Sequence, residues 1–240
     1  QEYSDETVGD LSIATTHTQA RYVLPGIIKD FIQSYPDVSL HMQQGTPMQI
    51  AAMAAEGVVD FAIATEALQQ FSDLIMMPCY RWNRCIVVPK EHPLAQLNKV
   101  TLEAVAEYSI VTYTFGFTGR SKLDEAFSSR GLVPKVVFTA VDSDVIKTYV
   151  RLGLGIGIIA GLAYDDDLDR DLVKLNADHL FASSVTSLAF RKGTFLRGYM
   201  YDFIEALAPH LNKELVQEAF SRANPGERQE LYSHIELPVF

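Results

Sequence analysis

The feature that most constrains the fold is an alternation of strand-like runs and helix-like segments in the first 65 residues. The runs 10–14, 38–44 and 59–65 have the length and apolar content of strands. The segments between them, 19–36 and 46–57, carry apolar residues at helical spacing. Strand, helix, strand, helix, strand is typical of a parallel sheet covered by helices, so we predict an α/β fold.

The same alternation continues along the rest of the chain, which predicts two such units. Further strands are expected at 84–90, 109–114, 135–141, 155–160 and 184–193, and further helices at 101–108, 119–131, 142–153 and 194–211. Helix starts are expected at Thr46, Thr101 and either Asp142 or Ser143, which are good N-cap residues. Pro25 either kinks the segment 19–36 or lies in its first turn, and the pattern leaves both open.

The charge balance excludes some partners. Thirty acidic and 20 basic residues give a formal net charge of −10, which repels nucleic acid and anionic membrane. The longest apolar run, at 152–164, is too short to span a bilayer and indicates a buried core segment, so no membrane partner is expected. The acidic N-terminus is not a signal peptide, although a cleaved secreted protein would look the same.

Cys79 and Cys85 form no disulfide framework and favour a reducing cytoplasm. Pairing between them stays open. A nucleophilic cysteine is disfavoured because neither has a histidine-containing signature around it. Trp82, between them, is expected to be a core residue or a hinge where the chain crosses between lobes.

Polar residues follow three of the predicted strands, where parallel sheets bind ligands. They are Thr15, Thr16, Thr18 and Gln19, then Thr65, then Thr114, Gly116, Thr118 and Gly119. Hydroxyls and backbone amides at helix starts would hold a small anion without a fixed counter-charge. The plain alternative is that each threonine only caps a helix.

Other polar features favour structural roles. His17 is expected to be a polar loop residue, and the aspartate run 165–171 a solvated turn rather than a calcium loop. The glycines of 153–157 precede a strand, so they do not fit a dinucleotide fingerprint. We therefore expect no catalytic residue, no metal and no cofactor.

The stretch "VGDLSIATTHTQARYVLPGIIKDFIQSYPDVSL", together with "GVVDFAIAT", "KEHPLAQLNKVTLEAVAEYSIV" and "VIKTYVRLGLGIGIIAG", resembles the effector-binding domain of LysR-type transcriptional regulators over nearly the whole chain. The resemblance implies a type II periplasmic-binding-protein-like fold, with two Rossmann-like lobes joined by crossing strands and the effector between them. Lobe I is then expected at 1–80 plus 184–207, lobe II at 81–183, and a C-terminal tail at 208–240.

The family's N-terminal winged helix-turn-helix is not found in this sequence, so promoter DNA and RNA polymerase would be contacted only through a full-length protein. The resemblance also implies a cytoplasmic homo-oligomer, a dimer for this domain and a tetramer for the full-length protein.

The stretches "TTHTQARYVLP" and "TYTFGFTGRS" are similar in sequence to those of family members that activate cysteine-biosynthesis and sulfur-assimilation genes. For these, the implied effector is N-acetylserine, with sulfate or thiosulfate in the same cleft. The implied binding residues are Thr16, Thr18, Gln19, Thr65 and Thr118.

Three alternatives remain open from the sequence. One is a regulator of sulfonate-sulfur utilisation from the same family, and another is a periplasmic sulfate or amino-acid carrier. An enzyme is the third, with Cys79 or Cys85 as nucleophile beside His17 or His92, which requires a proximity that the sequence does not show.

Overall fold

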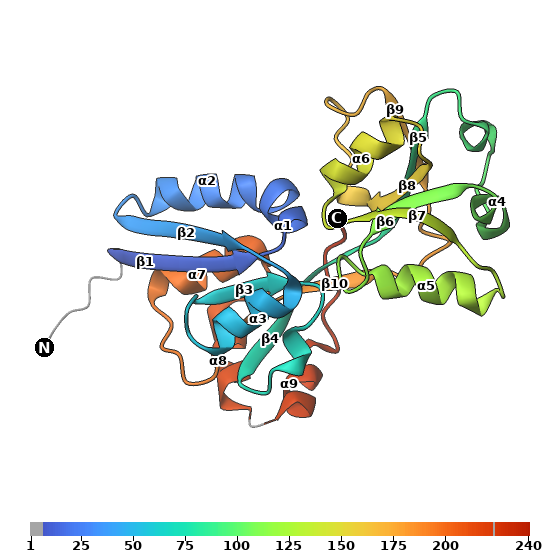
Figure 1. Ribbon diagram of the computed structural model, residues 1–240. Coiled ribbons are helices and arrows are strands. Elements are labelled where there is room, and N and C mark those ends of the chain that lie inside the picture. Colours follow the sequence, from blue (N-terminus) through green and yellow to red (C-terminus); the bar gives the residue numbers. More distant parts are fainter. Residues whose placement is uncertain (1–6, 223) are drawn as a thin grey trace, which may run out of the picture. The chain divides into compact units, whose positions relative to one another are not determined.

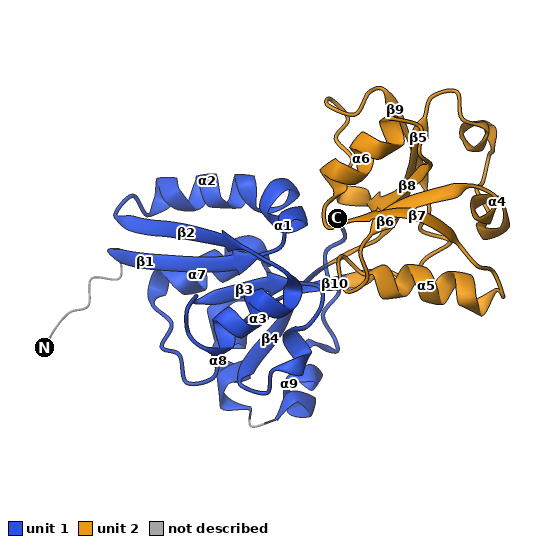
Figure 2. Cartoon of the chain, viewed as in Figure 1, with its two compact units in different colours: residues 1–80, 185–239 blue, residues 81–184, 240 orange. Residues whose placement is uncertain are grey.

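The computed structural model describes residues 7–222 and 224–240, and these form two compact units (Figure 1). Unit 1 runs to Tyr80 and resumes at Val185–Val239, whereas unit 2 comprises Arg81–Ser184 with Phe240 (Figure 2). Each unit is built on its own five-stranded sheet. The α/β architecture predicted from the sequence is confirmed.

The sheet of unit 1 has the strand order β2-β1-β3-β10-β4. Its strands are β1 (Gly9–Thr15), β2 (Val38–Gln44), β3 (Phe61–Ala64), β4 (Leu74–Trp82) and β10 (Ser184–Arg191). Its helices are α1 (His17–Tyr22), α2 (Leu24–Ser34), α3 (Pro47–Ala55), η1 (Leu68–Gln70), α7 (Gly198–Leu207), α8 (Lys213–Ser221) and α9 (Pro225–Tyr232). β1 lies parallel to β2 and β3, as the sequence predicts.

The sheet of unit 2 has the order β7-β6-β8-β5-β9. Its strands are β5 (Arg84–Pro89), β6 (Ser109–Tyr113), β7 (Lys135–Ala140), β8 (Ile156–Ala160) and β9 (Leu172–Asn176). Its helices are η2 (Pro93–Gln96), α4 (Leu102–Ala106), α5 (Arg120–Ser129), α6 (Ser143–Arg151) and η3 (Gly161–Ala163). β6 is parallel to β7 and β8.

The sheets are mixed rather than purely parallel. β10 runs antiparallel to β3, and β5 runs antiparallel to both β8 and β9. The chain passes from unit 1 to unit 2 after Tyr80 and returns after Ser184. β5 is the first strand after the chain passes into unit 2, and β10 is the first strand after it returns to unit 1. Neither follows a helix that crosses over from a neighbouring strand, which is the connection that makes neighbouring strands parallel.

The segment 19–36 forms two helices instead of one. α1 ends at Tyr22 and α2 begins at Leu24, with Val23 at a non-ideal φ of −113° between them. Pro25 lies in the first turn of α2, where its missing N–H breaks no intrahelical bond. The segment is therefore interrupted just before Pro25, and the proline lies near the start of the second helix instead of the start of the whole segment.

Strand β4 lies outside the predicted set of strands. Its sequence contains Pro78, which lacks the N–H that an interior strand would use. The structure accommodates the proline because β4 is the outermost strand of its sheet. The helix predicted at 194–211 is also shorter, since α7 begins only at Gly198.

Each unit has a buried apolar core. In unit 1, small residues of α3 pack on the sheet, including Ala51 and Ala54 against Ala62. In unit 2 the core includes Ile110 and Phe127. Within the described residues, no helix combines the length and apolar character that crossing a membrane requires.

The start of α3 gives a first testable prediction. The Thr46 hydroxyl accepts a hydrogen bond from the Gln49 amide at 3.1 Å, and the Gln49 side chain accepts one from the Thr46 amide at 2.9 Å. Thr46→Ala removes half of this capping box and should lower the free energy of unfolding by about 1 kcal/mol in urea titrations. Thr148→Ala, at an exposed position inside α6, serves as control and should change it by less than about 0.5 kcal/mol. Equal effects for both variants would contradict the capping role.

Candidate functional site

Unit 1 contains a polar cluster at the carboxyl ends of β1 and β3. We define this unit 1 polar cluster as Thr16, Thr18, Gln19, Thr65, Tyr80 and Thr186. The Thr16 hydroxyl donates to the Gln19 side-chain oxygen, and the Gln19 amide donates to the Thr186 hydroxyl at 3.4 Å. The hydroxyls of Thr65 and Thr186 lie 2.9 Å apart. The first two predicted stretches thus meet within one unit.

Thr186 is bonded to both Gln19 and Thr65 in this cluster, and it is not among the predicted site residues. It is fully buried on β10, 121 positions from Thr65 in the sequence. The one available signal was its place in the alternating strand "SVTSLAF", where it falls among buried residues. A buried hydroxyl on a strand needs a hydrogen-bond partner, and Thr65 and Gln19 provide it.

Tyr80, the second residue missed, lies at the end of the unit 1 portion of β4. It is fully buried. Burial raises the pKa of Tyr80, and interactions of its hydroxyl with Thr186 and Gln19 oppose that rise only in part. The phenol therefore stays protonated and neutral at physiological pH, which keeps the cluster uncharged.

Neither Thr15 nor Thr16 caps a helix with its side chain, which was the plain alternative to a ligand-binding role. Thr16 occupies the N-cap position of α1, but its side chain makes no capping hydrogen bond. Thr15 instead donates to the carbonyl of Ile63 at 2.8 Å and ties β1 to β3. Because α1 has only six residues, its dipole is small and the side chains dominate the polarity here.

The Thr18 hydroxyl is buried and lacks a hydrogen-bond partner among the described residues. The whole residue is only 2% exposed. A buried hydroxyl without a partner costs about 1–3 kcal/mol. A buried hydroxyl without a protein partner is satisfied by ordered water or by a bound ligand.

Unit 2 carries the third predicted stretch, the turn between β6 and α5. Thr118 is 7% exposed and has a φ of +44°, which is costly for a residue with a Cβ. Gly116 and Gly119 on either side also have positive φ, at +86° and +67°. Backbone strain of this kind is found at binding sites. The assignment of Thr118 to a ligand stays a prediction.

The structure shows why neither cysteine is suited to catalysis. Both are unpaired and buried. Burial raises the pKa of the Cys79 thiol and of the Cys85 thiol to about 12. Nearly all of each thiol is therefore protonated at neutral pH, whereas a cysteine nucleophile acts as the thiolate.

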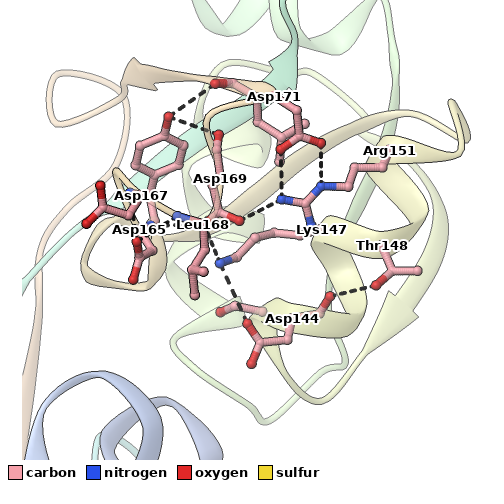
Figure 3. Close-up of polar contacts among 12 residues, drawn as sticks. Asp144, Lys147, Thr148, Arg151, Asp165, Asp167, Leu168, Asp169 and Asp171 are labelled. Atoms are coloured by element: carbon pink, nitrogen blue, oxygen red, sulfur yellow. Dashed lines mark hydrogen bonds and ion pairs between the residues drawn. The ribbon is translucent and has the colours of Figure 1, made fainter.

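The prediction of a solvated turn for the aspartate run is wrong for Asp169. Its side chain is 4% exposed and contacts Lys147 and Arg151, as Figure 3 shows. Asp165 accepts hydrogen bonds from the amides of the exposed residues Asp167 and Leu168 at 2.8 and 2.9 Å, which agrees with a solvated turn for that part of the run. Sequence alone misses the burial of Asp169 because the two basic partners lie on α6, about 20 positions earlier.

His17, expected in a loop, is the first residue of α1. Unit 1 also has an open hollow of about 250 Å³ at some remove in sequence from the cluster. It is lined by Thr194, Phe195, Leu196, Tyr201, Gln217 and Phe220. Since this lining includes none of the predicted site residues, we do not connect it with the polar cluster.

Neutral hydrogen-bonding groups at the strand ends of an α/β scaffold are suited to binding a small polar molecule. The LysR substrate binding domain family matches residues 4–212. The chain belongs to this family. Named relatives in this family are transcriptional regulators, so the chain is a regulatory domain and not an enzyme.

Individual relatives agree with this membership. The chain is 53% identical over 236 residues to the HTH-type transcriptional regulator CysB of Haemophilus influenzae, covering 98% of this chain and 73% of that protein. It is 52% identical over 213 residues to the HTH-type transcriptional regulator SsuR of Burkholderia cenocepacia, covering 89% and 69%. The crystal structure of the cofactor-binding domain of the Cbl transcriptional regulator matches with a TM-score of 0.88 and 40% identity, covering 93% of this chain and 98% of that one. The predicted periplasmic-binding-protein-like fold is thereby confirmed.

Proposed function

We propose that this chain is the effector-sensing domain of a transcriptional activator of cysteine-biosynthesis and sulfur-assimilation genes. Two observations support the proposal. The chain shares 53% and 52% identity with relatives named CysB and SsuR. The cluster in unit 1 also has the chemistry of a site for a small polar anion. The family membership favours this function over a periplasmic carrier.

The buried Thr18 hydroxyl carries the proposal for the effector site. It has no hydrogen-bond partner among the described residues, and Thr18 directly precedes Gln19 in α1, whose side chain is bonded to Thr16 and Thr186. The proposed binding residues are Thr16, Thr18, Gln19 and Thr65 of unit 1, with Thr118 as the contribution of unit 2. N-acetylserine suits such a mixed set, since it offers a carboxylate together with an amide and a hydroxyl. Sulfate and thiosulfate, which carry no proton at neutral pH, can only accept hydrogen bonds.

A regulator of sulfonate-sulfur utilisation remains the second candidate, and the SsuR relative favours it specifically. Identities of 53% and 52% do not separate the two. The preferred effector separates them instead. Tighter binding of N-acetylserine than of sulfate would favour the cysteine regulator, and the reverse order would favour the alternative.

We further propose that the domain acts as a homodimer and as part of a tetramer in a full-length protein in the cytoplasm. Contact with promoter DNA and RNA polymerase would then come through parts of that protein other than this acidic domain, whose net charge is −10. Light scattering of the purified chain with and without effector tests the dimer, because a monomer at all concentrations would contradict it.

Thr18→Val gives the sharpest test of the site, because valine keeps the shape of threonine and removes only the hydroxyl. The variant should unfold at a higher temperature than the wild type, since an unsatisfied buried hydroxyl is lost. The same variant should bind N-acetylserine about 10- to 100-fold more weakly, since a hydrogen bond to a charged ligand is lost. Calorimetric titration and thermal melts measure both effects.

The opposite signs of these two effects identify a ligand-binding hydroxyl. Thr112→Val is the matched control, because the Thr112 hydroxyl is also buried but donates to the Ile158 carbonyl at 2.8 Å. It should lower stability and leave affinity unchanged. If Thr18→Val binds N-acetylserine, sulfate and thiosulfate as the wild type does, the hydroxyl is not part of the site. If the wild type binds none of the three, the proposed effector class is wrong.

A further inference from the structure

Arg84, the first residue of β5, is a buried arginine whose guanidinium group joins separate segments of unit 2. It is 2% exposed. Nη1 donates to the carbonyl of Ala182 at 2.9 Å. Nη2 donates to the Ser184 hydroxyl at 2.6 Å and to the Gly119 carbonyl at 3.0 Å. The guanidinium carbon lies 4.4 Å from the centre of the Trp82 ring. One side chain thus links β5, the 182–184 segment and the turn before α5.

The turn is shaped to receive this guanidinium group. Gly119 has a φ of +67°, and a Cβ placed on it would lie 1.7 Å from Arg84 Nη2. The guanidinium group therefore occupies the space that a side chain at position 119 would need. Glycine is required there for both its conformation and its missing Cβ.

Thr118 directly precedes this glycine and shares its unusual backbone. Its φ of +44° persists only if its surroundings hold it. The bond from Arg84 to the Gly119 carbonyl supplies such a restraint, and a charged donor makes it stronger than a neutral one. The Ser184 hydroxyl and the Ala182 carbonyl, in turn, fix the direction of the guanidinium group.

We propose that Arg84 is a positioning residue for effector binding: its guanidinium group clamps the Thr118–Gly119 turn to the 182–184 segment and so presents the Thr118 hydroxyl to the effector. This inference rests on the proposed function, in which Thr118 contacts the effector. Arg84 itself acts through Thr118 and needs no contact with the ligand. Lysine cannot replace it, because an ammonium group lacks the planar fork that reaches three oxygen acceptors at once.

The test is a double-mutant cycle measured by calorimetric titration of the whole chain with N-acetylserine and with sulfate. Ser184→Ala and Arg84→Lys should each weaken binding about five- to tenfold in the wild-type background. Both effects should vanish when Thr118→Ala is already present, since the clamp then has no hydroxyl to position. A general structural role would weaken binding equally in both backgrounds.

Arg228→Lys is the control for replacing a buried arginine. Arg228 is 5% exposed and donates to the Arg222 carbonyl at 3.0 Å, within unit 1 and outside the polar cluster. This variant should lower the melting temperature and leave affinity unchanged. If Arg84→Lys does not fold, Ser184→Ala carries the cycle alone, because it removes one acceptor and keeps the arginine.

Trp82 adds an optical readout, since it is the only tryptophan of the chain and lies against the guanidinium group. Effector binding should change its emission in the wild type, and Ser184→Ala should reduce that change at saturating effector. The positioning role would be overturned if the affinity losses of Ser184→Ala and Thr118→Ala were additive, or if Ser184→Ala left the affinity unchanged. Either result would leave the proposed function standing. Absence of binding to the wild-type chain would overturn the proposed function, and this inference with it.

Discussion

Lys147→Met is expected to lower the free energy of unfolding by about 3 kcal/mol, because it leaves a carboxylate buried without its ammonium partner. The Lys147 ammonium lies 2.7 Å from an Asp169 carboxylate oxygen, and the two side chains are 3% and 4% exposed. Arg151 contacts the other carboxylate oxygen at 2.7 Å, which keeps the loss at the lower end of the range for buried pairs. Urea titration at pH 7 measures the effect.

The surroundings of Asp169 explain why this pair is tightly held. The Asp165 amide donates to the same carboxylate at 2.9 Å, and Arg151 also bridges to Asp171 at 2.7 Å (Figure 3). α6 is thereby fixed to the segment that leads into β9. Restoring an apolar match with Lys147→Met and Asp169→Leu together should recover most of the loss, since no charge then stays buried.

The same carboxylate predicts a pH dependence. Burial raises the pKa of Asp169, but hydrogen bonds from Lys147, the Asp165 amide and Arg151 outweigh burial and bring the pKa below its usual value. The unfolded chain therefore binds this proton more readily than the folded one. The stabilisation is complete above about pH 4, where the unfolded aspartate ionises, and is lost as the pH falls through the lowered folded-state pKa.

An exposed ion pair in the same segment provides the control. Arg170 and Asp167 lie 2.8 Å apart but are 76% and 83% exposed. Arg170→Met should change the free energy of unfolding by less than about 1 kcal/mol. The acid-induced loss of stability should be shallower in Asp169→Asn than in the wild type. A loss in Lys147→Met no larger than that in Arg170→Met would show that the buried pair contributes little.

Local signals in the sequence predicted much of the fold. Thr46, Thr101 and Asp142 cap their helices as expected, since each accepts a hydrogen bond from a backbone amide three residues on. Such caps depend only on neighbouring residues, which is why pattern alone finds them. Strand β4 was missed for a non-local reason, because only the sheet order shows that Pro78 lies in an edge strand.

Long-range pairing limits what the sequence reveals of the candidate site. Thr16, Gln19 and Thr65 are found because they follow strands. Thr186 and Arg84 belong to no such pattern, since their partners lie 121 and 100 positions away in the chain. A buried polar residue is recognisable only once its partners are brought together, and that is a property of the fold.

Gly155→Ala should be among the most destabilising single-methyl additions in this chain, lowering the free energy of unfolding by about 3 kcal/mol. Gly155 directly precedes β8, and a Cβ on it would lie 2.3 Å from the Ser109 carbonyl oxygen. That oxygen is backbone at the start of β6, the parallel neighbour of β8. It can move only if the strand pair separates, whereas a flexible side chain could turn away.

Alanine substitutions at Gly155, Gly157 and Gly26 should change the free energy of unfolding to different degrees in urea titrations. A Cβ on Gly157 would meet a Val87 methyl group at 2.6 Å, and a side chain can shift, so Gly157→Ala should cost less than Gly155→Ala. Gly26→Ala is the control, because Gly26 lies in α2 and a Cβ placed on it would have nothing within 4 Å. It should stabilise the chain by about 0.5–1 kcal/mol. A loss of stability that decreases in the order Gly155, Gly157, Gly26 would show that Gly155 and Gly157 serve close strand packing, whereas equal effects at all three positions would contradict that explanation.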